Sequence, residues 1–299
     1  MENDQKIISL PSGNLAYLEA GEGEPLLFLH GFPDTPKSFS AQIAFFSEKG
    51  FRCLAPYLPG YGNSDLPKEG GASLGAVAEM MEQFLRATLG EGEKPFVVGH
   101  DWGSAIAQLL GIRQNPPVKA LVLAAVPPAR TLMAHFSLSQ LWHSRYMFAF
   151  QFPFAAKRLR QQSLSYIRTL WRRWSPALPS DHPQLQETIE LLMQPGCLEK
   201  AILYYRYAIN PFYFFQGQAP KETLREFLQR QKVPGLVAWG KDDGCMVEKT
   251  FTGSLEAFSH PLSDVLPMAG AGHFLHIEAP EPFNEALLDF FTRVQRLPG

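Results

Sequence analysis

The sequence predicts an α/β fold in which helices flank a mostly parallel β-sheet and a helical segment is inserted near the middle of the chain. Short apolar runs alternate with stretches of helical spacing up to residue 124, an order typical of a parallel sheet covered on both faces. The alternation stops after Pro127-Pro128 and resumes at Val233. A glycine-flanked turn, Gly99-His100-Asp101-Trp102-Gly103, joins one apolar run to the helical run that follows it.

Taken in order, the expected strands are short apolar runs that end in turn residues. They cover residues 15–19, 25–29, 51–55, 95–98 and 120–124, and, after the insertion, 233–239 and 264–268. Stretches of helical spacing lie between them at residues 38–49, 74–89 and 104–114, and a last helix is expected at 281–296. The strands and these helices form the expected core domain, residues 1–128 and 220–299.

The inserted segment, residues 129–219, is expected to be a helical cap domain. It is rich in aromatic and basic residues, contains helical runs such as 155–170 and 197–209, and shows no evident parallel strand. Such an insertion is tolerated when its entry and exit points lie close together on the host domain. The run Trp171-Arg172-Arg173-Trp174 is interpreted as a helix end that packs on the core domain, because four residues are weak evidence for a nucleic-acid or membrane patch.

Composition limits the classes of protein that this chain can be. Its 299 residues are 45% hydrophobic and 19% charged, which suits a large core, and the net charge of −2 gives no sign of nucleic-acid binding. Three widely spaced cysteines, Cys53, Cys197 and Cys245, predict neither a disulfide framework nor a metal site. Neither a signal-peptide pattern nor a spanning apolar run is present. We expect a cytoplasmic monomer or homodimer with no nucleic-acid or membrane partner.

The turn around Asp101 is the strongest functional signal in the sequence. A strand, a sharp turn with small flanking residues and a helix form the setting of a nucleophile elbow, which holds its central side chain above the end of the sheet. A carboxylate there can attack an activated carbon and form an ester. Asp101 could instead only cap the following helix, but the flanking glycines and a suitable histidine favour the nucleophile.

Hydrolysis of that ester needs a base that activates a water molecule, and His273 is the best candidate. It lies in the glycine-rich turn Gly270-Ala271-Gly272-His273-Phe274, after the last predicted strand. A catalytic histidine needs an acid on its other ring nitrogen. Asp243 follows the preceding strand and is preferred for this role, with the adjacent Asp242 as the rival.

The turn His30-Gly31-Phe32-Pro33 ends the strand expected beside the elbow strand. In such folds this loop and the residue after the nucleophile supply the two backbone N–H groups that stabilise an oxyanion. Here these groups belong to Phe32 and Trp102. We expect Phe32, Trp102, His30 and Pro33 to line the substrate site.

These segments together resemble an α/β-hydrolase fold protein of the epoxide hydrolase family, over nearly the whole chain. The motifs that support this resemblance are His30-Gly31-Phe32-Pro33, Gly99-His100-Asp101-Trp102-Gly103 and Gly272-His273-Phe274. The resemblance implies hydrolysis of an epoxide to a vicinal diol, without an organic cofactor or a metal. It also implies two cap tyrosines that protonate the epoxide oxygen, and Tyr146 and Tyr205 match them, with Tyr204 and Tyr207 as competitors for the second position.

Haloalkane and haloacid dehalogenases use the same Asp-His-Asp triad and are the alternative. They need a second halide donor, which often comes from an Asn after the His-Gly pair or from a cap Trp. Here Phe32 offers no side-chain donor, and only Trp142 or Trp171 could supply one. A hydrolase-fold protein that binds a ligand without turnover is a third possibility, which the apparently complete triad disfavours. The cap's Phe148, Phe150, Phe152, Phe212, Phe214 and Phe215 suggest a small apolar substrate.

Overall fold

The central sheet has eight strands, and β2 alone runs in the opposite direction to the others. A computed structural model describes residues 5–210 and 225–297 of the chain. The strand order is β1-β2-β4-β3-β5-β6-β7-β8, with antiparallel pairing only at β1–β2 and β2–β4. The bounds are β1 Lys6–Leu10, β2 Gly13–Ala20, β3 Glu24–Leu29, β4 Phe51–Pro56, β5 Phe96–His100, β6 Ala120–Ala124, β7 Gly235–Gly240 and β8 Asp264–Met268.

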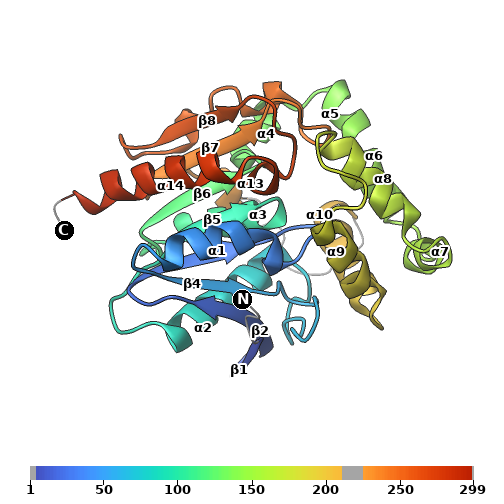
Figure 1. Cartoon of the computed structure of the whole chain (residues 1–299), viewed down its shortest axis with the longest axis horizontal. Coiled ribbons are helices and arrows are strands. Elements are labelled where there is room, and N and C mark those ends of the chain that lie inside the picture. Colours follow the sequence, from blue (N-terminus) through green and yellow to red (C-terminus); the bar gives the residue numbers. More distant parts are fainter. Residues whose placement is uncertain (1–4, 211–224, 298–299) are drawn as a thin grey trace.

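Helices cover both faces of this sheet (Figure 1). Helix α1 (Ser40–Ser47) packs with α14 (Pro280–Gln295) on one face, and α2 (Leu74–Thr88) packs with α3 (Trp102–Gly111) on the other. Strands β3, β5 and β6 lie between these layers, and β5 and β6 are buried along their whole length. Continuous burial explains why these strands read as unbroken apolar runs rather than as alternating ones.

Between β6 and β7 the described chain forms helices joined by loops and adds no strand to the sheet. It forms α4 Ala129–Ala134, α5 Leu138–His143, α6 Arg145–Ala149, α7 Ala155–Gln161, α8 Ser165–Trp174, α9 Pro183–Met193 and α10 Cys197–Ile209. Helices α5 to α10 gather at one end of the molecule, beyond the strands (Figure 1). The expected α/β fold with an inserted helical segment is therefore confirmed. The expected boundary between residues 219 and 220, and with it the cap domain of residues 129–219, stays a prediction because residues 211–224 lie outside the described part.

Two local expectations were wrong. The helical run at 155–170 is two helices, because Ser163 and Leu164 take left-handed backbone angles, with φ of 49° and 56°, and redirect the chain. Strand β1 was not expected at all. It is an edge strand paired only with β2 and exposed over most of its length, so it carries no continuous apolar run.

The remaining elements lie close to their expected ranges. Strands β6 and β8 have the predicted bounds, and the other expected strands shift by one or two residues at their ends. The expected last helix, 281–296, corresponds to α14, and a short helix that was not expected, α13 (Leu275–Glu278), precedes it. Short 3₁₀ helices at Pro36–Phe39, Glu248–Phe251 and Ser254–Ala257 complete the described structure.

Candidate active site

Asp101 occupies a sharp turn between β5 and α3. Its backbone angles, φ 53° and ψ −115°, lie outside the regions that ordinary residues favour, and its side chain makes no capping hydrogen bond to α3. The carboxylate instead reaches the loop after β3, where the backbone N–H of Phe32 donates to Asp101 Oδ1 over 2.8 Å. A strained backbone whose side chain is held away from its own helix is a feature of reactive positions.

Glycines make this close approach possible. A Cβ at Gly31 would collide with the Asp101 carboxylate, and a Cβ at Gly103 would collide with the carbonyl of Leu29. Both positions therefore need a residue without a side chain. The loop after β3 and the first turn of α3 can lie against the elbow only because these two residues are glycine.

His273 and Asp243 form a buried pair next to Asp101. Asp243 Oδ2 lies 2.9 Å from His273 Nδ1, and His273 Nε2 lies 3.7 Å from Asp101 Oδ2. The other Asp243 oxygen accepts from the backbone N–H groups of Cys245 and Met246, at 2.6 and 2.9 Å. The rival Asp242 is exposed to solvent. The sequence-predicted nucleophile, acid and histidine thus lie together, with His273 between the two carboxylates.

The charges around His273 control its protonation. Burial alone would lower the pKa of its imidazole, but the carboxylates of Asp243 and Asp101 raise that pKa to about 10. The histidine is therefore an imidazolium at neutral pH while both carboxylates are ionised. Its pKa must fall when either carboxylate loses its charge.

Tyr146 and Tyr205 approach the same space from two cap helices. Tyr146 lies on α6 and Tyr205 on α10, and their rings are 5.5 Å apart with an interplanar angle of 80°. Both hydroxyls are buried. Burial is the main reason that their pKa values lie well above the usual range, and the charge of Asp101 raises both further. The Tyr205 ring packs on that of Trp102, the residue after Asp101, and Tyr146 packs on Tyr205, so both phenols lie beside the elbow.

Tyr204 faces a different neighbour. Its hydroxyl donates to the carbonyl of Pro59 over 2.8 Å, which ties α10 to the loop after β4. The Tyr205 hydroxyl has no hydrogen-bond partner within the described structure. The centroid of the Tyr205 ring lies 4.9 Å from that of Trp102 and 5.2 Å from that of Phe32.

Unpartnered donors and apolar walls characterise the interior of the site. In the described part of the chain, Tyr205 Oη, Trp102 Nε1 and His273 Nε2 are buried and lack hydrogen-bond partners. The walls include Phe150, whose ring lies 5.7 Å from that of Tyr146, and Trp174, whose ring lies 5.0 Å from that of His273. Buried polar atoms without partners are costly, and a substrate oxygen or a water in this space would satisfy them.

His30 and Pro33 hold the loop after β3 in place. His30 Nδ1 lies 2.9 Å from the carbonyl of Gly31, and His30 Nε2 accepts from the N–H of Leu58 over 3.0 Å. Burial lowers the pKa of His30 to about 4. The Pro33 carbonyl accepts from the indole N–H of Trp171 over 2.8 Å. With both ring nitrogens occupied, His30 fixes the position of the loop rather than offering a polar atom to a ligand.

The cap aromatic side chains divide into two groups. Phe150 is buried in the site, whereas Phe148 and Phe152 are exposed, contrary to the expectation that they contribute to an apolar pocket. Phe212, Phe214 and Phe215 lie outside the described residues. Trp171 and Trp174 are buried, and Trp171 stacks on Phe274 with ring centroids 4.0 Å apart, so the interpretation of this helix end as a packing element is confirmed.

Sequence reasoning missed Cys245. Its thiol is buried beside the acid, and its sulfur lies 3.7 Å from the Tyr146 hydroxyl. Burial raises the pKa of this thiol well above its usual range. Cys245 lies two positions after Asp243 in the loop that follows β7, and this position was the only feature of the sequence that could have pointed to it.

A second polar cluster lies behind the elbow and was also missed. Asp34 Oδ2 lies 3.9 Å from His100 Nδ1 and 3.8 Å from His276 Nε2, and all three side chains are fully buried. Burial raises the pKa of Asp34 to about 7 and lowers that of His100 to about 3. His100 Nε2 also lies 3.0 Å from the His273 carbonyl. The two separations from Asp34 exceed a direct hydrogen bond, whereas the contact with the His273 carbonyl is one.

Two groups of described residues have ligand atoms close enough to hold a metal ion. They are the cluster of Asp34, His100 and His276, and the set of Asp243, Cys245 and His273. In the second group the carboxylate and imidazole are already paired with each other. The expectation of a metal-independent site stays a prediction.

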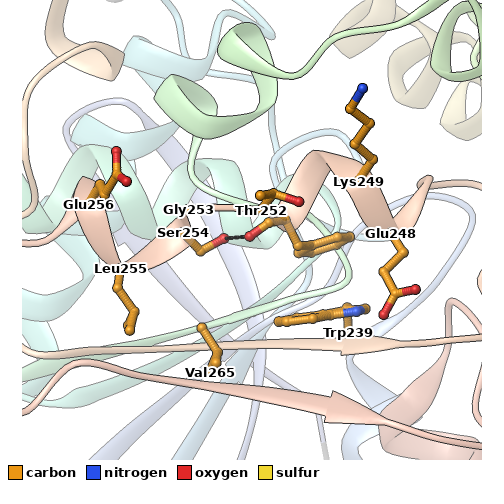
Figure 2. Close-up of a pocket in the computed structure, with 10 residues that line it drawn as sticks. Trp239, Glu248, Lys249, Thr252, Gly253, Ser254, Leu255, Glu256 and Val265 are labelled. Atoms are coloured by element: carbon orange, nitrogen blue, oxygen red, sulfur yellow. Dashed lines mark hydrogen bonds between the residues drawn. The ribbon is translucent and has the colours of Figure 1, made fainter.

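A large open hollow lies elsewhere, beside the end of β7 (Figure 2). Its volume is about 680 Å³, and its walls include Trp239, Glu248, Leu255 and Val265. The Trp239 and Phe251 rings stack there with centroids 4.8 Å apart. None of the predicted site residues lines this hollow.

In the described part of the chain, no helix has the length and apolar character needed to cross a bilayer.

Comparison with known proteins agrees with this geometry. Epoxide hydrolase 3 of Mus musculus is 29% identical over 92% of this chain and 73% of its own length. The solved structure of Bacillus megaterium epoxide hydrolase in complex with an inhibitor matches with a TM-score of 0.79 and 26% identity, over 96% of this chain and 100% of that one.

A laboratory-evolved variant of potato epoxide hydrolase matches with a TM-score of 0.80 over 98% of this chain and 100% of that one, and its 23% identity shows the fold alone. The sequence pattern described as the alpha/beta hydrolase fold matches residues 24–280. This match spans both the core strands and the inserted helices. The chain therefore belongs to the alpha/beta hydrolase fold family.

Proposed function

We propose that this protein is an epoxide hydrolase that converts a small apolar epoxide and water to a vicinal diol through an ester on Asp101. One observation carries the proposal. Two buried phenols, Tyr146 and Tyr205, pack against each other beside Trp102, and the neighbouring Asp101 carboxylate lies 3.7 Å from a histidine that is paired with a second acid. Relatives named as epoxide hydrolases support the same conclusion.

The first step opens the epoxide ring. Asp101 Oδ1 accepts the Phe32 N–H, so Oδ2 is the oxygen free to attack a ring carbon. The bond from Oδ2 to that carbon forms as the bond from the carbon to the ring oxygen breaks. The oxygen takes a proton from the Tyr146 or Tyr205 hydroxyl, because an alkoxide is a poor leaving group without an acid. The product is a hydroxyalkyl ester of Asp101.

The second step returns the free enzyme. Esterification removes the charge of Asp101, so the pKa of His273 falls and the imidazolium can give its proton to the tyrosinate. The neutral His273 then takes a proton from water, oriented by Asp243, and the hydroxide attacks the Asp101 carbonyl carbon. The backbone N–H groups of Phe32 and Trp102 are proposed to stabilise the resulting oxyanion. As the intermediate collapses, the leaving diol oxygen takes the proton held by His273, and the new Asp101 carboxylic acid gives its proton back to His273, which restores the carboxylate and the imidazolium.

The dehalogenase alternative lacks a second halide donor in the described structure. Trp142 is 63% exposed on the outside of the cap, and the Trp171 indole N–H is already bonded to Pro33. Phe32 contributes a hydrocarbon ring. The Trp102 indole N–H is buried against Tyr205 and has no hydrogen-bond partner, and one such N–H donor leaves a halide poorly stabilised.

The proposed activity is tested with a panel of aryl and alkyl epoxides and matched 1-haloalkanes. We expect the epoxides to yield diols and the haloalkanes to release no halide above the rate without enzyme. In water enriched in ¹⁸O, a single turnover should place label in the Asp101 carboxylate, because water attacks the ester carbonyl rather than the substrate carbon. Halide release without diol formation would assign the site to dehalogenation, and no turnover of either class would favour a ligand-binding protein.

The two neighbouring tyrosines on α10 provide a matched test of the proposed acid. We expect Tyr205→Phe to lower kcat/KM for an epoxide by about 10²-fold, since it removes an acid from the ring-opening step. Tyr204→Phe should leave the rate nearly unchanged and cost about 1 kcal/mol of stability, since it removes one buried hydrogen bond. Steady-state kinetics and thermal unfolding of both variants measure these effects, and equal rate losses would contradict the assignment.

The protonation of His273 should depend on Asp101. The folded pKa of about 10 lies above the ordinary value of 6.5, so the imidazolium form persists through neutral pH and is lost as the pH rises towards 10. In Asp101→Asn, which imitates the lost charge of the ester, we expect this pKa to fall by about 1–3 units. NMR titration of labelled histidine measures it, with Asp242→Asn as the control that should not change it.

A cytoplasmic location and a monomeric or homodimeric state stay predictions. The three cysteines are free and buried, which is compatible with a reducing compartment. The division into a core of residues 1–128 and 220–299 and a cap of residues 129–219 also belongs to the proposal, since the cap would supply the tyrosines and the core would supply the triad.

A further inference from the structure

The outer surface of the cap exposes an unusual concentration of large apolar side chains. Of the fourteen such side chains that are exposed in the described residues, eight lie between Met133 and Phe154. The most exposed are Leu138 at 84%, Phe154 at 75% and Phe152 at 69%. Scattered exposed apolar residues are normal, but a concentration in one short segment marks an interaction surface.

The charge of this region is one-sided. Residues 129–180 contain eight of the chain's 27 Lys and Arg and none of its 29 Asp and Glu. The rest of the chain is therefore net negative, although the whole chain is nearly balanced. Arg130, Arg145, Lys157, Arg158 and Arg172 make no ion pair with any described residue. These unpaired cations surround the exposed apolar side chains along the sequence.

Local geometry places the two chemistries side by side. The loop between α6 and α7 exposes Phe152, Pro153 and Phe154 in succession, and the exposed Lys157 and Arg158 follow on the first turns of α7. On the neighbouring helix, the Arg145 guanidinium lies over the exposed Trp142 ring at 4.4 Å. Exposed Phe and Trp beside Lys and Arg are the composition of segments that rest in a membrane interface.

The same cap helix faces both this surface and the proposed site. On α6 and its C-terminal residue, Tyr146 and Phe150 are buried against the site, whereas Phe148 is 52% exposed on the outside. Phe148 lies two residues after Tyr146 on this short helix, so a surface that touches Phe148 would lie close to the proposed acid. An apolar epoxide dissolved in such a surface would then reach the site over a short path.

We propose that the cap surface formed by Leu138, Trp142, Phe148, Phe152 and Phe154 docks on a lipid bilayer with anionic headgroups and admits lipophilic epoxides from it. The part about substrate entry rests on the proposed function, whereas the docking itself does not. Apolar side chains enter the headgroup region while the unpaired cations bind the anionic lipids. A second copy in a two-fold arrangement would place the cationic segment against itself, which disfavours that occupant.

This inference differs from what the sequence suggested about membranes. The expectation of no membrane partner considered spanning segments and the Trp171–Trp174 run, whose tryptophans are indeed buried. Peripheral docking needs no spanning helix. It needs the exposed side chains of short helices, which become visible only when burial is known.

Vesicle cosedimentation of the full-length protein tests the docking. Vesicles of phosphatidylcholine alone are compared with vesicles that also contain phosphatidylglycerol. We expect binding to the anionic vesicles that weakens about tenfold on neutral vesicles and falls as salt is added. Phe152→Ser/Phe154→Ser and Lys157→Glu/Arg158→Glu should each weaken it by about tenfold.

Matched controls keep the test specific. Ile7→Ser/Leu255→Ser changes exposed apolar side chains outside the segment, and Lys94→Glu/Lys232→Glu changes exposed lysines outside it; neither should weaken binding. Hydrolysis of a water-soluble epoxide without vesicles should be unchanged in all four double variants. If no variant or wild-type protein turns over an epoxide while vesicle binding behaves as expected, the proposed function fails and the docking stands.

Three results would overturn the docking proposal. The first is a wild-type protein that does not pellet with anionic vesicles. The second is equal weakening in the control variants. The third is a wild-type dimer, seen by light scattering, that dissociates in Phe152→Ser/Phe154→Ser and does not bind vesicles, which would assign the surface to a second copy of the chain.

Discussion

Asp101→Asn is expected to lower diol formation by at least about 10³-fold. An amide cannot attack the ring carbon, so the ester cannot form. The fold should persist, because an amide oxygen can still accept the Phe32 N–H that Asp101 Oδ1 accepts over 2.8 Å. Steady-state diol formation and thermal unfolding of freshly purified protein measure both effects.

Asp242→Asn is the matched control, since it makes the same chemical change on an exposed carboxylate outside the triad. It should retain wild-type activity. Slow recovery of activity in stored Asp101→Asn, with a gain of about 1 Da that reflects deamidation, would support the nucleophile because the carboxylate is restored. Undiminished activity in fresh Asp101→Asn of confirmed mass would contradict the proposed mechanism.

His273→Gln is expected to stop turnover after the first step and to accumulate the ester. The nucleophile Asp101 remains, and the tyrosines still supply the acid, but no base activates water against the ester carbonyl. Intact-protein mass spectrometry after incubation with an epoxide should show one added substrate mass. Peptide mapping should place it on Asp101, and steady-state diol formation should fall by about 10³-fold or more.

The double variant Asp101→Asn/His273→Gln provides the control and should show no adduct. An adduct that persists in the double variant would mean that another nucleophile reacts, and Cys245 would be the first to examine because its thiol lies in the same site. Full turnover by His273→Gln would assign the base elsewhere. Absence of any adduct, with any epoxide or haloalkane, would favour a binding protein.

The parallel strands and the triad could be predicted from the sequence because each follows a local rule. Strands β6 and β8 are bounded by turn residues and have the predicted bounds. Asp101, Asp243 and His273 each follow a strand of a parallel sheet, and the carboxyl ends of neighbouring strands bring such residues together. The preference for Asp243 over Asp242 is supported by the 2.9 Å contact between Asp243 Oδ2 and His273 Nδ1.

What the sequence could not supply depends on burial and on long-range packing. The break at Ser163 and Leu164 depends on left-handed backbone angles that neither residue type signals. Phe148 and Phe152 lie on either side of the buried Phe150, and residue type alone does not reveal which of the three faces the site. The cluster of Asp34, His100 and His276 joins residues that are far apart in sequence and close only in the folded chain.

The two proposed acids stand on separate helices, Tyr146 on α6 and Tyr205 on α10, while the nucleophile is fixed by the backbone packing around Gly31 and Gly103. A small shift of one helix against the other would therefore tilt the bound ring without moving Asp101. The tilt decides which of the two ring carbons meets Asp101 Oδ2, and hence the handedness of the diol. Substitutions at the contacts of α6 and α10 with the rest of the cap should alter stereochemical outcome while leaving the chemistry of ester hydrolysis intact.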